Sequence, residues 1–389
     1  MNVLWISNIL FPAPCKALGL PTPVLGGWMY ASAKALTGSS SDVKLAVAAV
    51  YKTGENIQKM EIDGIIYYLL PLKGNNTKYD KSLEPLWRQV TDEFHPDLVH
   101  LHGTEFAHGL AYLKACPDIK SVVSIQGLIS VCARYYYGGI SPWTIFRNIS
   151  IRDIIKRDTL FQQKRKFQKR GQIECEILKR TRHIIGRTSW DKAHAWAINP
   201  DAVYHLCNEI LRPSFYEGEW EYEKCEKYSI FLSQSGYPIK GLHQVIKALP
   251  FVLKAYPDAR VYVAGSNIIS SVSWWEQLKI TGYGRYIRSL IRKYDLSDKV
   301  EFVGIQNEME IKNRYLSANV FLCPSVIENS PNSLGEAQLL GVPHIASYVG
   351  GSPDMMIGNE ACLYRFEEVE MLAEKICRVF EKKEHAMKS

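Results

Sequence analysis

The chain has 389 residues and is 47% apolar, so it can bury sizeable cores, and its length predicts two domains of roughly 150–200 residues each. Its nine cysteines form no C-x-x-C pair, which argues against a disulfide framework or a zinc site and favours reduced thiols in a cytoplasmic protein. We expect neither a signal peptide nor a membrane span, because the first residues lack a basic lead and no run of about 18 apolar residues occurs.

The formal net charge of +7 is concentrated in one segment. From residue 147 to residue 187 the chain has thirteen Lys or Arg residues against four Asp or Glu residues, so the rest of the chain is slightly acidic. Apolar residues recur at roughly helical spacing among these cations, which predicts amphipathic helices. Such helices suit the anionic inner face of a membrane, where each nearby cation contributes about 1 kcal/mol, or an anionic acceptor such as a lipid pyrophosphate. A solvated helix face packed on the first domain is the plainer alternative, and no recognised motif favours nucleic acid.

Strand-like and helix-like segments alternate along the first half of the chain. The expected strands are residues 3–6, 43–50, 62–69, 98–103, 121–127 and 183–188, and the expected helices are residues 28–36, 83–94, 106–116 and 190–198. This alternation is typical of an α/β fold with a doubly wound parallel sheet. We expect the first domain to span residues 1–210 and the second to span residues 211–369.

Polar residues stand at the ends of three of the expected strands in this half. Ligands bind beyond the carboxyl ends of the strands in such sheets, which selects His102 and Gln126 as residues of a binding cleft. Arg187, at the end of a third strand, is a cation at the same edge. A hydrogen-bonded structural histidine is the alternative interpretation of His102.

The second half continues the alternation. The expected strands are residues 228–233, 259–266, 299–304, 318–323 and 342–347, and the expected helices are residues 241–253, 285–294, 331–340 and 369–383. The helix that starts near residue 331 follows a strand directly and stops at Gly341, as a strand–loop–helix–strand unit of a parallel sheet would.

The start of that helix has the features of an anion-binding site. After Asn329, Ser330 can cap the helix and Pro331 suits its first position. The residues that follow, Asn332, Ser333 and Leu334, are expected to present unpaired backbone N–H groups at the positive end of the helix dipole. That arrangement binds phosphate or carboxylate groups.

Two carboxylates flank this helix start. Glu328 lies in the loop before it, and Glu336 lies eight residues further on, in the second turn of the helix. Carboxylates accept hydrogen bonds from vicinal hydroxyl groups. An acceptor, then amide donors, then a second acceptor suit a ligand with a sugar at each end and phosphate between them, which is a nucleotide-sugar.

The same stretch carries a family resemblance. E-x7-E, then G-x-P-x-I-A-S, then a Gly-Gly pair resembles the retaining glycosyltransferases of the GT-B class, family 4. The matching residues are Glu328, Glu336, Gly341, Pro343, Ile345, Ala346, Ser347, Gly350 and Gly351. The resemblance implies two Rossmann-like, doubly wound domains that face a cleft.

The resemblance also implies roles for single residues. Lys240 is expected to hold the donor diphosphate, while Ser235 stands where the family has a second cation, an arginine. Arg187 is a candidate substitute for that arginine. Gln126 stands where the family often has a histidine near the acceptor and the donor sugar. Glutamine cannot take a proton, so His102 is expected to replace that histidine in part.

Three further expectations come from the family. Gly26 and Gly27 are expected to face the donor phosphates, and the backbone at Ile305 is expected to contact the nucleobase. The C-terminal helix, about residues 370–389, is expected to cross back onto the first domain.

The residues predict a nucleotide-sugar as ligand, and the resemblance implies a retaining glycosyltransferase that moves its sugar to an acceptor hydroxyl in bacterial surface polysaccharide or glycolipid assembly. Glu328, Lys240, His102 and Gln126 are the expected catalytic residues. No Asp-x-Asp occurs, so we expect no metal and no other cofactor. A glycan or lipid-linked acceptor is the expected partner, with an anionic membrane surface contacted by residues 147–187. The alternatives are a nucleotide-sugar 2-epimerase of the same fold and a non-catalytic, membrane-docked relative.

Overall fold

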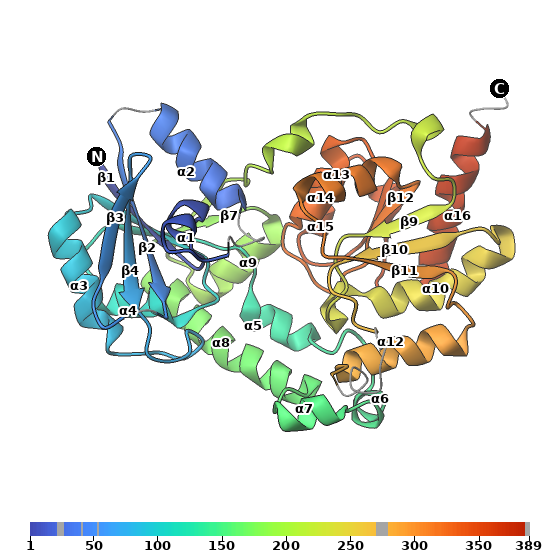
Figure 1. Cartoon of the computed structure of the whole chain (residues 1–389), viewed down its shortest axis with the longest axis horizontal. Coiled ribbons are helices and arrows are strands. Elements are labelled where there is room, and N and C mark those ends of the chain that lie inside the picture. Colours follow the sequence, from blue (N-terminus) through green and yellow to red (C-terminus); the bar gives the residue numbers. More distant parts are fainter. Residues whose placement is uncertain (22–26, 40–41, 53, 270–278, 386–389) are drawn as a thin grey trace. The chain divides into compact units, whose positions relative to one another are not determined.

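The computed structural model describes residues 1–21, 27–39, 42–52, 54–269 and 279–385 (Figure 1). Contacts divide the chain into two compact units. Unit 1 consists of residues 1–133 and 167–212, and unit 2 consists of residues 134–166 and 213–389. The chain passes from unit 2 back to unit 1 inside one long helix, α8 (Leu160–Arg180).

Within the described ranges, unit 1 contains an eight-stranded sheet in the order β3-β4-β2-β1-β5-β6-β7-β8. Its strands are β1 (Asn2–Ser7), β2 (Lys44–Tyr51), β3 (Gln58–Ile62), β4 (Ile65–Pro71), β5 (Leu98–His102), β6 (Ser121–Ser124), β7 (His183–Gly186) and β8 (Val203–Leu206). Strands β3 and β4 form an antiparallel hairpin, and the other neighbours run parallel. The expected α/β sheet is confirmed. The sequence analysis missed β3 and β8 because these edge strands are polar or exposed along much of their length.

Helices cover both faces of this sheet. They are α1 (Pro12–Ala17), α2 (Gly27–Ser39), α3 (Leu83–Phe94), α4 (Ala107–Ala115), α5 (Ile129–Cys132), the second part of α8, and α9 (Ser189–Ile198). Because side chains alternate along a strand, Leu4 and Ile6 of β1 join a core with α3 and α4, whereas Val3 and Trp5 join a core with α2.

Unit 2 contains a six-stranded sheet among its described residues, in the order β11-β10-β9-β12-β13-β14, and each pair of neighbours runs parallel. Its strands are β9 (Ser229–Leu232), β10 (Arg260–Ala264), β11 (Val300–Gly304), β12 (Val320–Cys323), β13 (His344–Ser347) and β14 (Leu363–Tyr364). Its helices are α6 (Pro142–Arg147), α7 (Ile151–Ile155), α10 (Leu242–Ala255), α12 (Gly282–Lys293), α13 (Glu308–Ser317), α14 (Asn332–Leu339), α15 (Ser352–Met355) and α16 (Val369–His385).

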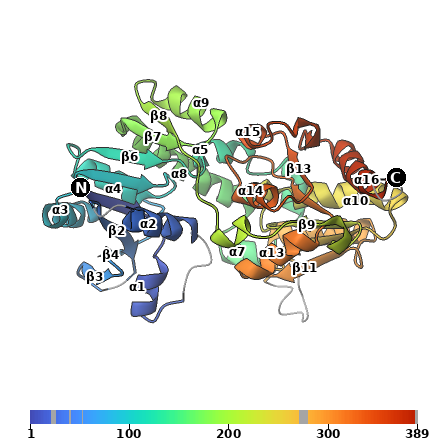
Figure 2. The same ribbon diagram turned by 90° about the horizontal axis from the view of Figure 1, so that it is seen from above.

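The C-terminal helix α16 packs within unit 2, and its expected contact with the first domain stays a prediction. It lies beside α10 (Figure 2). The ring of Phe380 lies 5.4 Å from that of Tyr228 and 5.2 Å from that of Tyr256. These aromatic contacts bury one face of the helix against its own unit.

The predicted domain limit near residue 210 lies close to the passage from unit 1 to unit 2 after Arg212. Residues 134–166, however, pack with unit 2, although the expected first domain included them. Only contacts between residues far apart in sequence decide this assignment. His243 Nε2, for example, lies 2.8 Å from the carbonyl oxygen of Gly138.

Each sheet has a point at which the strand order changes direction. In unit 1 this point lies between β1 and β5, and in unit 2 it lies between β9 and β12. Open α/β sheets bind ligands beyond the carboxyl ends of the strands at such points. The loops after β1 and β5, and those after β9 and β12, are therefore the places to look for functional residues.

Candidate active site

An ion pair occupies the point between β9 and β12 in unit 2. The Lys240 ammonium, from the loop after β9, contacts the Glu328 carboxylate from the loop after β12, and Ser325 Oγ donates to the same carboxylate at 2.9 Å. The side chains of Lys240 and Glu328 are 19% and 15% exposed. Burial opposes the charge of Lys240, but the neighbouring carboxylate raises the pKa of Lys240 above its ordinary value. The lysine is therefore protonated at neutral pH.

Two glycines let the loops around this pair approach one another. A β-carbon on Gly241, which has a φ of +75°, would lie 1.8 Å from the carbonyl oxygen of Pro324. A β-carbon on Gly350, at φ +52°, would lie 1.8 Å from the carbonyl oxygen of Glu328. Gly351 N donates to that same oxygen at 3.1 Å. The position of Glu328 therefore depends on glycine in the loop after β13.

The prediction that Ser330 caps the following helix is wrong. Helix α14 begins at Asn332, and the capping position is Pro331, whose ψ of 115° is extended. The Ser330 hydroxyl instead lies 3.6 Å from the sulfur of Met355. The backbone N–H of Leu334 donates to the carbonyl oxygen of Pro331 at 3.0 Å, so it is not one of the unpaired donors that the sequence predicted. The positive end of the α14 dipole is still at Asn332, four positions after Glu328 in the sequence.

The other acidic and polar candidates of unit 2 are arranged around this helix and the neighbouring loops. Glu336 is 6% exposed in the second turn of α14, and its Oε2 lies 3.4 Å from the Tyr315 hydroxyl. Asn329 is buried, and Ser333 is partly exposed and accepts a hydrogen bond from the Tyr315 hydroxyl through its carbonyl oxygen. A buried tyrosine thus supports both the first turn of α14 and its second carboxylate.

Two candidates of unit 2 differ sharply in exposure. Ser235 is 2% exposed, and its hydroxyl has no hydrogen-bond partner among the described residues. It is polar but cannot supply the positive charge of an arginine. Ile305 is 71% exposed, directly after β11, and its contact with the nucleobase stays a prediction.

In unit 1, His102 lies at the carboxyl end of β5 inside an aromatic cluster. It is 3% exposed, with ring centroids 3.8 Å from His100 and 4.4 Å from Trp5. Burial lowers the pKa of His102 well below its usual value, and the neighbouring His100 adds to this effect. Neither ring nitrogen has a hydrogen-bond partner within the described part of the chain. His102 is therefore a neutral imidazole, and its catalytic role stays a prediction.

Arg187 is engaged inside unit 1. Its guanidinium forms an ion pair of 3.0 Å with Glu209 and donates to the carbonyl oxygen of Gln126 at 2.7 Å. The side chain of Gln126 is partly buried at the end of β6. Gly27 begins α2, and Gly26 lies outside the described residues.

The sequence analysis missed a carboxyl group at the point between β1 and β5. Asn8 Nδ2, after β1, donates to Glu105 Oε2, after β5, at 3.1 Å. Gly103, at φ +91°, makes room for this group, because a β-carbon there would lie 2.2 Å from Glu105 Oε2. Burial raises the pKa of Glu105 to about 7, and the nearby Glu174 carboxyl acts in the same direction. An acid shortly after a strand and a glycine, as in His102-Gly103-Thr104-Glu105, is the signal that could have identified it.

Glu105 should make stability depend on pH. The folded pKa of about 7 exceeds the ordinary value of 4.5, so unfolding releases a proton between these pH values and stability falls as the pH rises from 4.5 to 7. We expect wild type to lose about 1–3 kcal/mol of its free energy of unfolding over this pH rise, since each pKa unit corresponds to about 1.4 kcal/mol and the side chain is only partly buried. Glu105→Gln should not show this loss. Urea unfolding of wild type and variant at pH 5 and pH 8 measures the difference. Parallel pH profiles for the two proteins would contradict the assignment.

Residues 219–389 match the family described as "Glycosyl transferases group 1". The chain is 30% identical over 152 residues to "GDP-mannose-dependent monoacylated alpha-(1-6)-phosphatidylinositol monomannoside mannosyltransferase" of Corynebacterium glutamicum. The matched region covers 37% of this chain and 35% of that protein. It is 31% identical over 144 residues to "Putative colanic acid biosynthesis glycosyltransferase WcaL" of Salmonella typhimurium, which covers 35% of this chain and 32% of that protein. The chain therefore spans about a third of the length of these curated relatives.

Among solved structures, sucrose-phosphate synthase from Thermosynechococcus elongatus is similar with a TM-score of 0.67 and 16% sequence identity. The similarity covers 98% of this chain and 90% of that chain. It confirms the expected fold, two Rossmann-like α/β parts of the GT-B type.

Proposed function

We propose that this chain, whose residues 219–389 match the group 1 glycosyl transferases, is a glycosyltransferase that moves a sugar from a nucleotide-sugar to an acceptor hydroxyl. The observation that carries the proposal is the partly buried Lys240–Glu328 pair at the strand-order change of unit 2, in which Glu328 precedes the start of α14 by four residues. The Corynebacterium relative is named for its dependence on GDP-mannose, which supports a nucleotide-sugar as the donor.

The site has the charges that such a transfer needs. The transition state carries positive charge on the sugar carbon and negative charge on the departing diphosphate. A protonated Lys240 and the positive end of α14 stabilise the diphosphate, and preorganised electrostatic terms of this kind are usually the largest in catalysis. Glu328 accepts hydrogen bonds from the hydroxyl groups of the donor sugar. Glu328 also contacts Lys240, and we propose that the donor diphosphate replaces Glu328 as the partner of this lysine.

Retention of configuration is part of the proposal. The departing phosphate accepts the proton of the acceptor hydroxyl on the face from which it leaves. This route needs no carboxylate nucleophile. Lys240 and the helix dipole stabilise the charge on the departing diphosphate, as a metal ion would. We therefore predict that the reaction needs no metal.

The acceptor is proposed to be a glycan or a lipid-linked sugar. The names of the two curated relatives support this class, since one acts on a phosphatidylinositol monomannoside and the other belongs to colanic acid biosynthesis. Asn8 and Glu105 lie at the strand-order change of unit 1, where a carboxyl group suits an acceptor hydroxyl. We propose that the enzyme works in the cytoplasm, at the inner face of a membrane when its acceptor is a lipid.

Glu105 also favours a second candidate reaction, the 2-epimerisation of a nucleotide-sugar. A 2-epimerase needs a group that can exchange a proton near neutral pH, and the pKa of Glu105, raised by burial to about 7, meets that requirement. Incubation of a nucleotide-sugar without acceptor separates the two reactions, because an epimerase converts the donor and a transferase leaves its sugar configuration unchanged. Donor binding without turnover across an acceptor panel would instead indicate a non-catalytic relative.

Nucleotide binding provides the first test. We expect one nucleoside diphosphate from a panel to stabilise the protein by about 2.7 kcal/mol at a concentration 100 times its dissociation constant. A thermal-shift screen identifies it, and incubation of the matching nucleotide-sugar with glycolipid and oligosaccharide acceptors then measures transfer. If none of the diphosphates raises the melting temperature, the proposed donor site is wrong.

The second carboxylate of the site should act on donor affinity. We expect Glu336→Gln to weaken nucleotide binding by about tenfold, because an amide is a poorer acceptor than a carboxylate for the two ribose hydroxyls. Isothermal titration calorimetry with the diphosphate found by the screen measures the change. Glu301→Gln, at an exposed position in β11 of the same unit, serves as the control and should bind like wild type. Equal affinity of all three proteins would remove Glu336 from the site.

A further inference from the structure

Helix α7 in unit 2 has an inverted distribution of polarity. Its aspartate, Asp153, is 3% exposed, whereas its three isoleucines, Ile151, Ile154 and Ile155, are 55%, 65% and 76% exposed. The isoleucines are spaced i, i+3 and i+4, so they lie on one face of the helix. A surface helix normally places its apolar side chains inward, and this one places them in the solvent.

The preceding helix also exposes apolar side chains. On α6, Trp143 is 65% exposed and Phe146 is 61% exposed, and their rings are stacked with centroids 5.9 Å apart. The buried side chain of α6 is Ile145. We call the exposed side chains of Trp143, Phe146, Ile151, Ile154 and Ile155 the α6–α7 surface.

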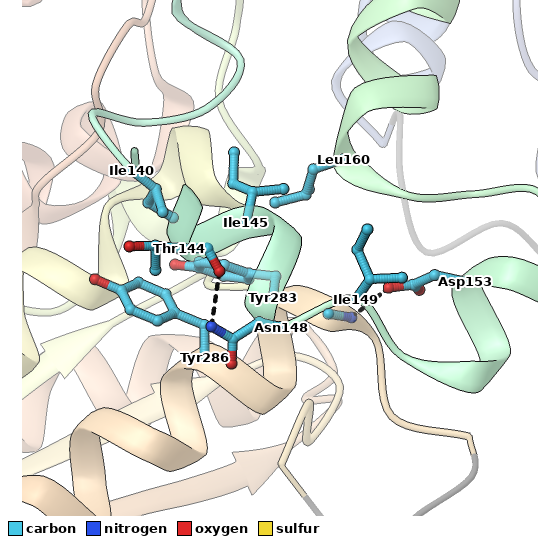
Figure 3. A pocket seen from close by; sticks show the side chains of 10 residues that line it. Ile140, Thr144, Ile145, Asn148, Ile149, Asp153, Leu160, Tyr283 and Tyr286 are labelled. Carbon is cyan, nitrogen blue, oxygen red and sulfur yellow. Dashed lines mark hydrogen bonds between the residues drawn. The ribbon is translucent and has the colours of Figure 1, made fainter. Parts of the chain in front are cut away.

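Packing beneath this surface fixes α6. Figure 3 shows Ile140, Ile145 and Leu160 around a small pocket with Tyr283 of α12. The guanidinium of Arg285, also in α12, donates to the carbonyl oxygen of Ile149 at 2.9 Å. These apolar and polar contacts belong to unit 2.

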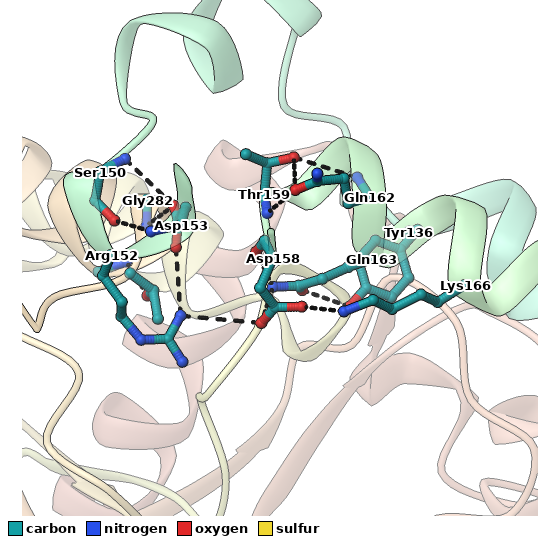
Figure 4. Close-up of polar contacts among 12 residues, drawn as sticks. Tyr136, Ser150, Arg152, Asp153, Asp158, Thr159, Gln162, Gln163, Lys166 and Gly282 are labelled. Atoms are coloured by element: carbon teal, nitrogen blue, oxygen red, sulfur yellow. Dashed lines mark hydrogen bonds and ion pairs between the residues drawn. The ribbon is translucent and has the colours of Figure 1, made fainter. Parts of the chain in front are cut away.

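Polar contacts fix α7 with its aspartate inward (Figure 4). The Asp153 carboxylate accepts hydrogen bonds from Gly282 N at 2.7 Å and from Ser150 N at 3.3 Å, and Arg152 donates to it at 3.3 Å. A β-carbon on Gly282 would lie 2.7 Å from this carboxylate, so glycine is needed for the contact. Turning the isoleucines inward would withdraw this carboxylate and leave the buried backbone N–H groups of Gly282 and Ser150 without their acceptor, which opposes the turn.

Exposed cations flank the apolar side chains in the sequence. Arg147, Lys156 and Arg157 are exposed. The two acids of the segment do not oppose them, since Asp153 is buried and Asp158 is ion-paired with Lys166 at 2.7 Å. The surface therefore combines aromatic and aliphatic side chains with unopposed positive charge, which is the chemistry of a peripheral membrane anchor.

We propose that the α6–α7 surface docks this protein onto a bilayer containing anionic lipids, with its aromatic and isoleucine side chains in the interfacial region and Arg147 and Lys156 on the lipid headgroups. Among the described residues no helix is both long and apolar enough to span a bilayer, so docking is peripheral in this part of the chain. The proposal moves the expected membrane contact from the basic segment, residues 147–187, to residues 142–157, which overlap that segment only over residues 147–157. It rests on the proposed function only for its purpose, which is to bring the enzyme to a lipid-linked acceptor.

Vesicle sedimentation of the full chain tests the docking. We expect wild type to bind phosphatidylcholine vesicles that contain about 30% phosphatidylglycerol and to bind pure phosphatidylcholine at least about tenfold more weakly. The double variant Ile154→Ser/Ile155→Ser should bind the anionic vesicles at least about tenfold more weakly than wild type. Arg147→Glu/Lys156→Glu should weaken binding to a similar extent and abolish the preference for anionic lipid.

The matched control is Ile357→Ser/Met371→Ser, which removes exposed apolar side chains elsewhere in unit 2. It should bind vesicles like wild type. Equal binding of Ile154→Ser/Ile155→Ser and wild type would overturn the proposal. So would self-association of wild type that is lost in this variant and is not accompanied by vesicle binding, because the apolar face would then belong to a second copy of the chain.

The outcome is separable from the donor site. Nucleoside diphosphate binding, measured by calorimetry in the absence of vesicles, should be the same for Ile154→Ser/Ile155→Ser and wild type. Vesicle binding by a protein that binds no diphosphate would overturn the proposed function and leave the docking surface standing. The reverse result would remove the docking surface alone.

Discussion

Glu328→Gln is expected to lower kcat by about 10²- to 10³-fold, the range measured when one preorganised electrostatic contact to a transition state is removed. The carboxylate contacts Lys240 and, as we propose, accepts hydrogen bonds from the hydroxyl groups of the donor sugar. The amide keeps the shape of the side chain and loses its charge. Initial rates at saturating donor measure kcat, and KM should change much less, because most donor affinity comes from the nucleotide.

Stability and catalysis can be separated at this pair. Glu328→Gln leaves the partly buried Lys240 charge without its carboxylate partner, so the variant should also melt at a lower temperature. The double variant Glu328→Gln/Lys240→Met removes both charges and should recover most of that loss while staying inactive. A double-mutant cycle across the two positions then gives their coupling. Wild-type kcat in Glu328→Gln would remove the carboxylate from the chemistry.

The sequence predicted the parts of the fold in which local pattern and burial agree. The helix expected over residues 83–94 is α3 (Leu83–Phe94), because its apolar spacing matches its buried face. The edge strands β3 and β8 were missed because the backbone of a neighbouring strand, not a buried apolar run, holds them in the sheet. The capping role was wrongly assigned to Ser330, because the extended ψ of Pro331 makes helix α14 begin only at Asn332.

The candidate site was predicted where a motif carries it and missed where only tertiary contacts reveal it. The spacing of Glu328 and Glu336 is visible in the sequence, and the pairing of Glu328 with Lys240 joins residues 88 positions apart. The Asn8–Glu105 contact joins residues 97 positions apart. The inverted polarity of α7 could not be predicted either. An aspartate in this segment is expected at the surface, and only the hydrogen bond from the distant Gly282 shows that Asp153 is buried.

Gly350→Ala is expected to destabilise the protein strongly and to inactivate it. The left-handed φ of +52° alone costs an L-residue about 1–2 kcal/mol. The added methyl group would also lie 1.8 Å from the Glu328 carbonyl oxygen, and such overpacking typically costs about 1–3 kcal/mol more. Because the displaced backbone belongs to Glu328, kcat should fall together with stability. Urea unfolding and initial rates below the unfolding transition measure the two effects.

Gly341→Ala is the matched control, because it separates the backbone angle from the overlap. Gly341 also has a left-handed φ, +72°, but a β-carbon there meets no atom within 4 Å. This variant should lose only about 1–2 kcal/mol and keep its kcat. The difference between the two variants therefore measures what the close approach of the loop after β13 to Glu328 contributes. Equal losses of stability, with kcat intact in both, would show that Gly350 is needed for its backbone angle alone and that the loop does not position the carboxylate.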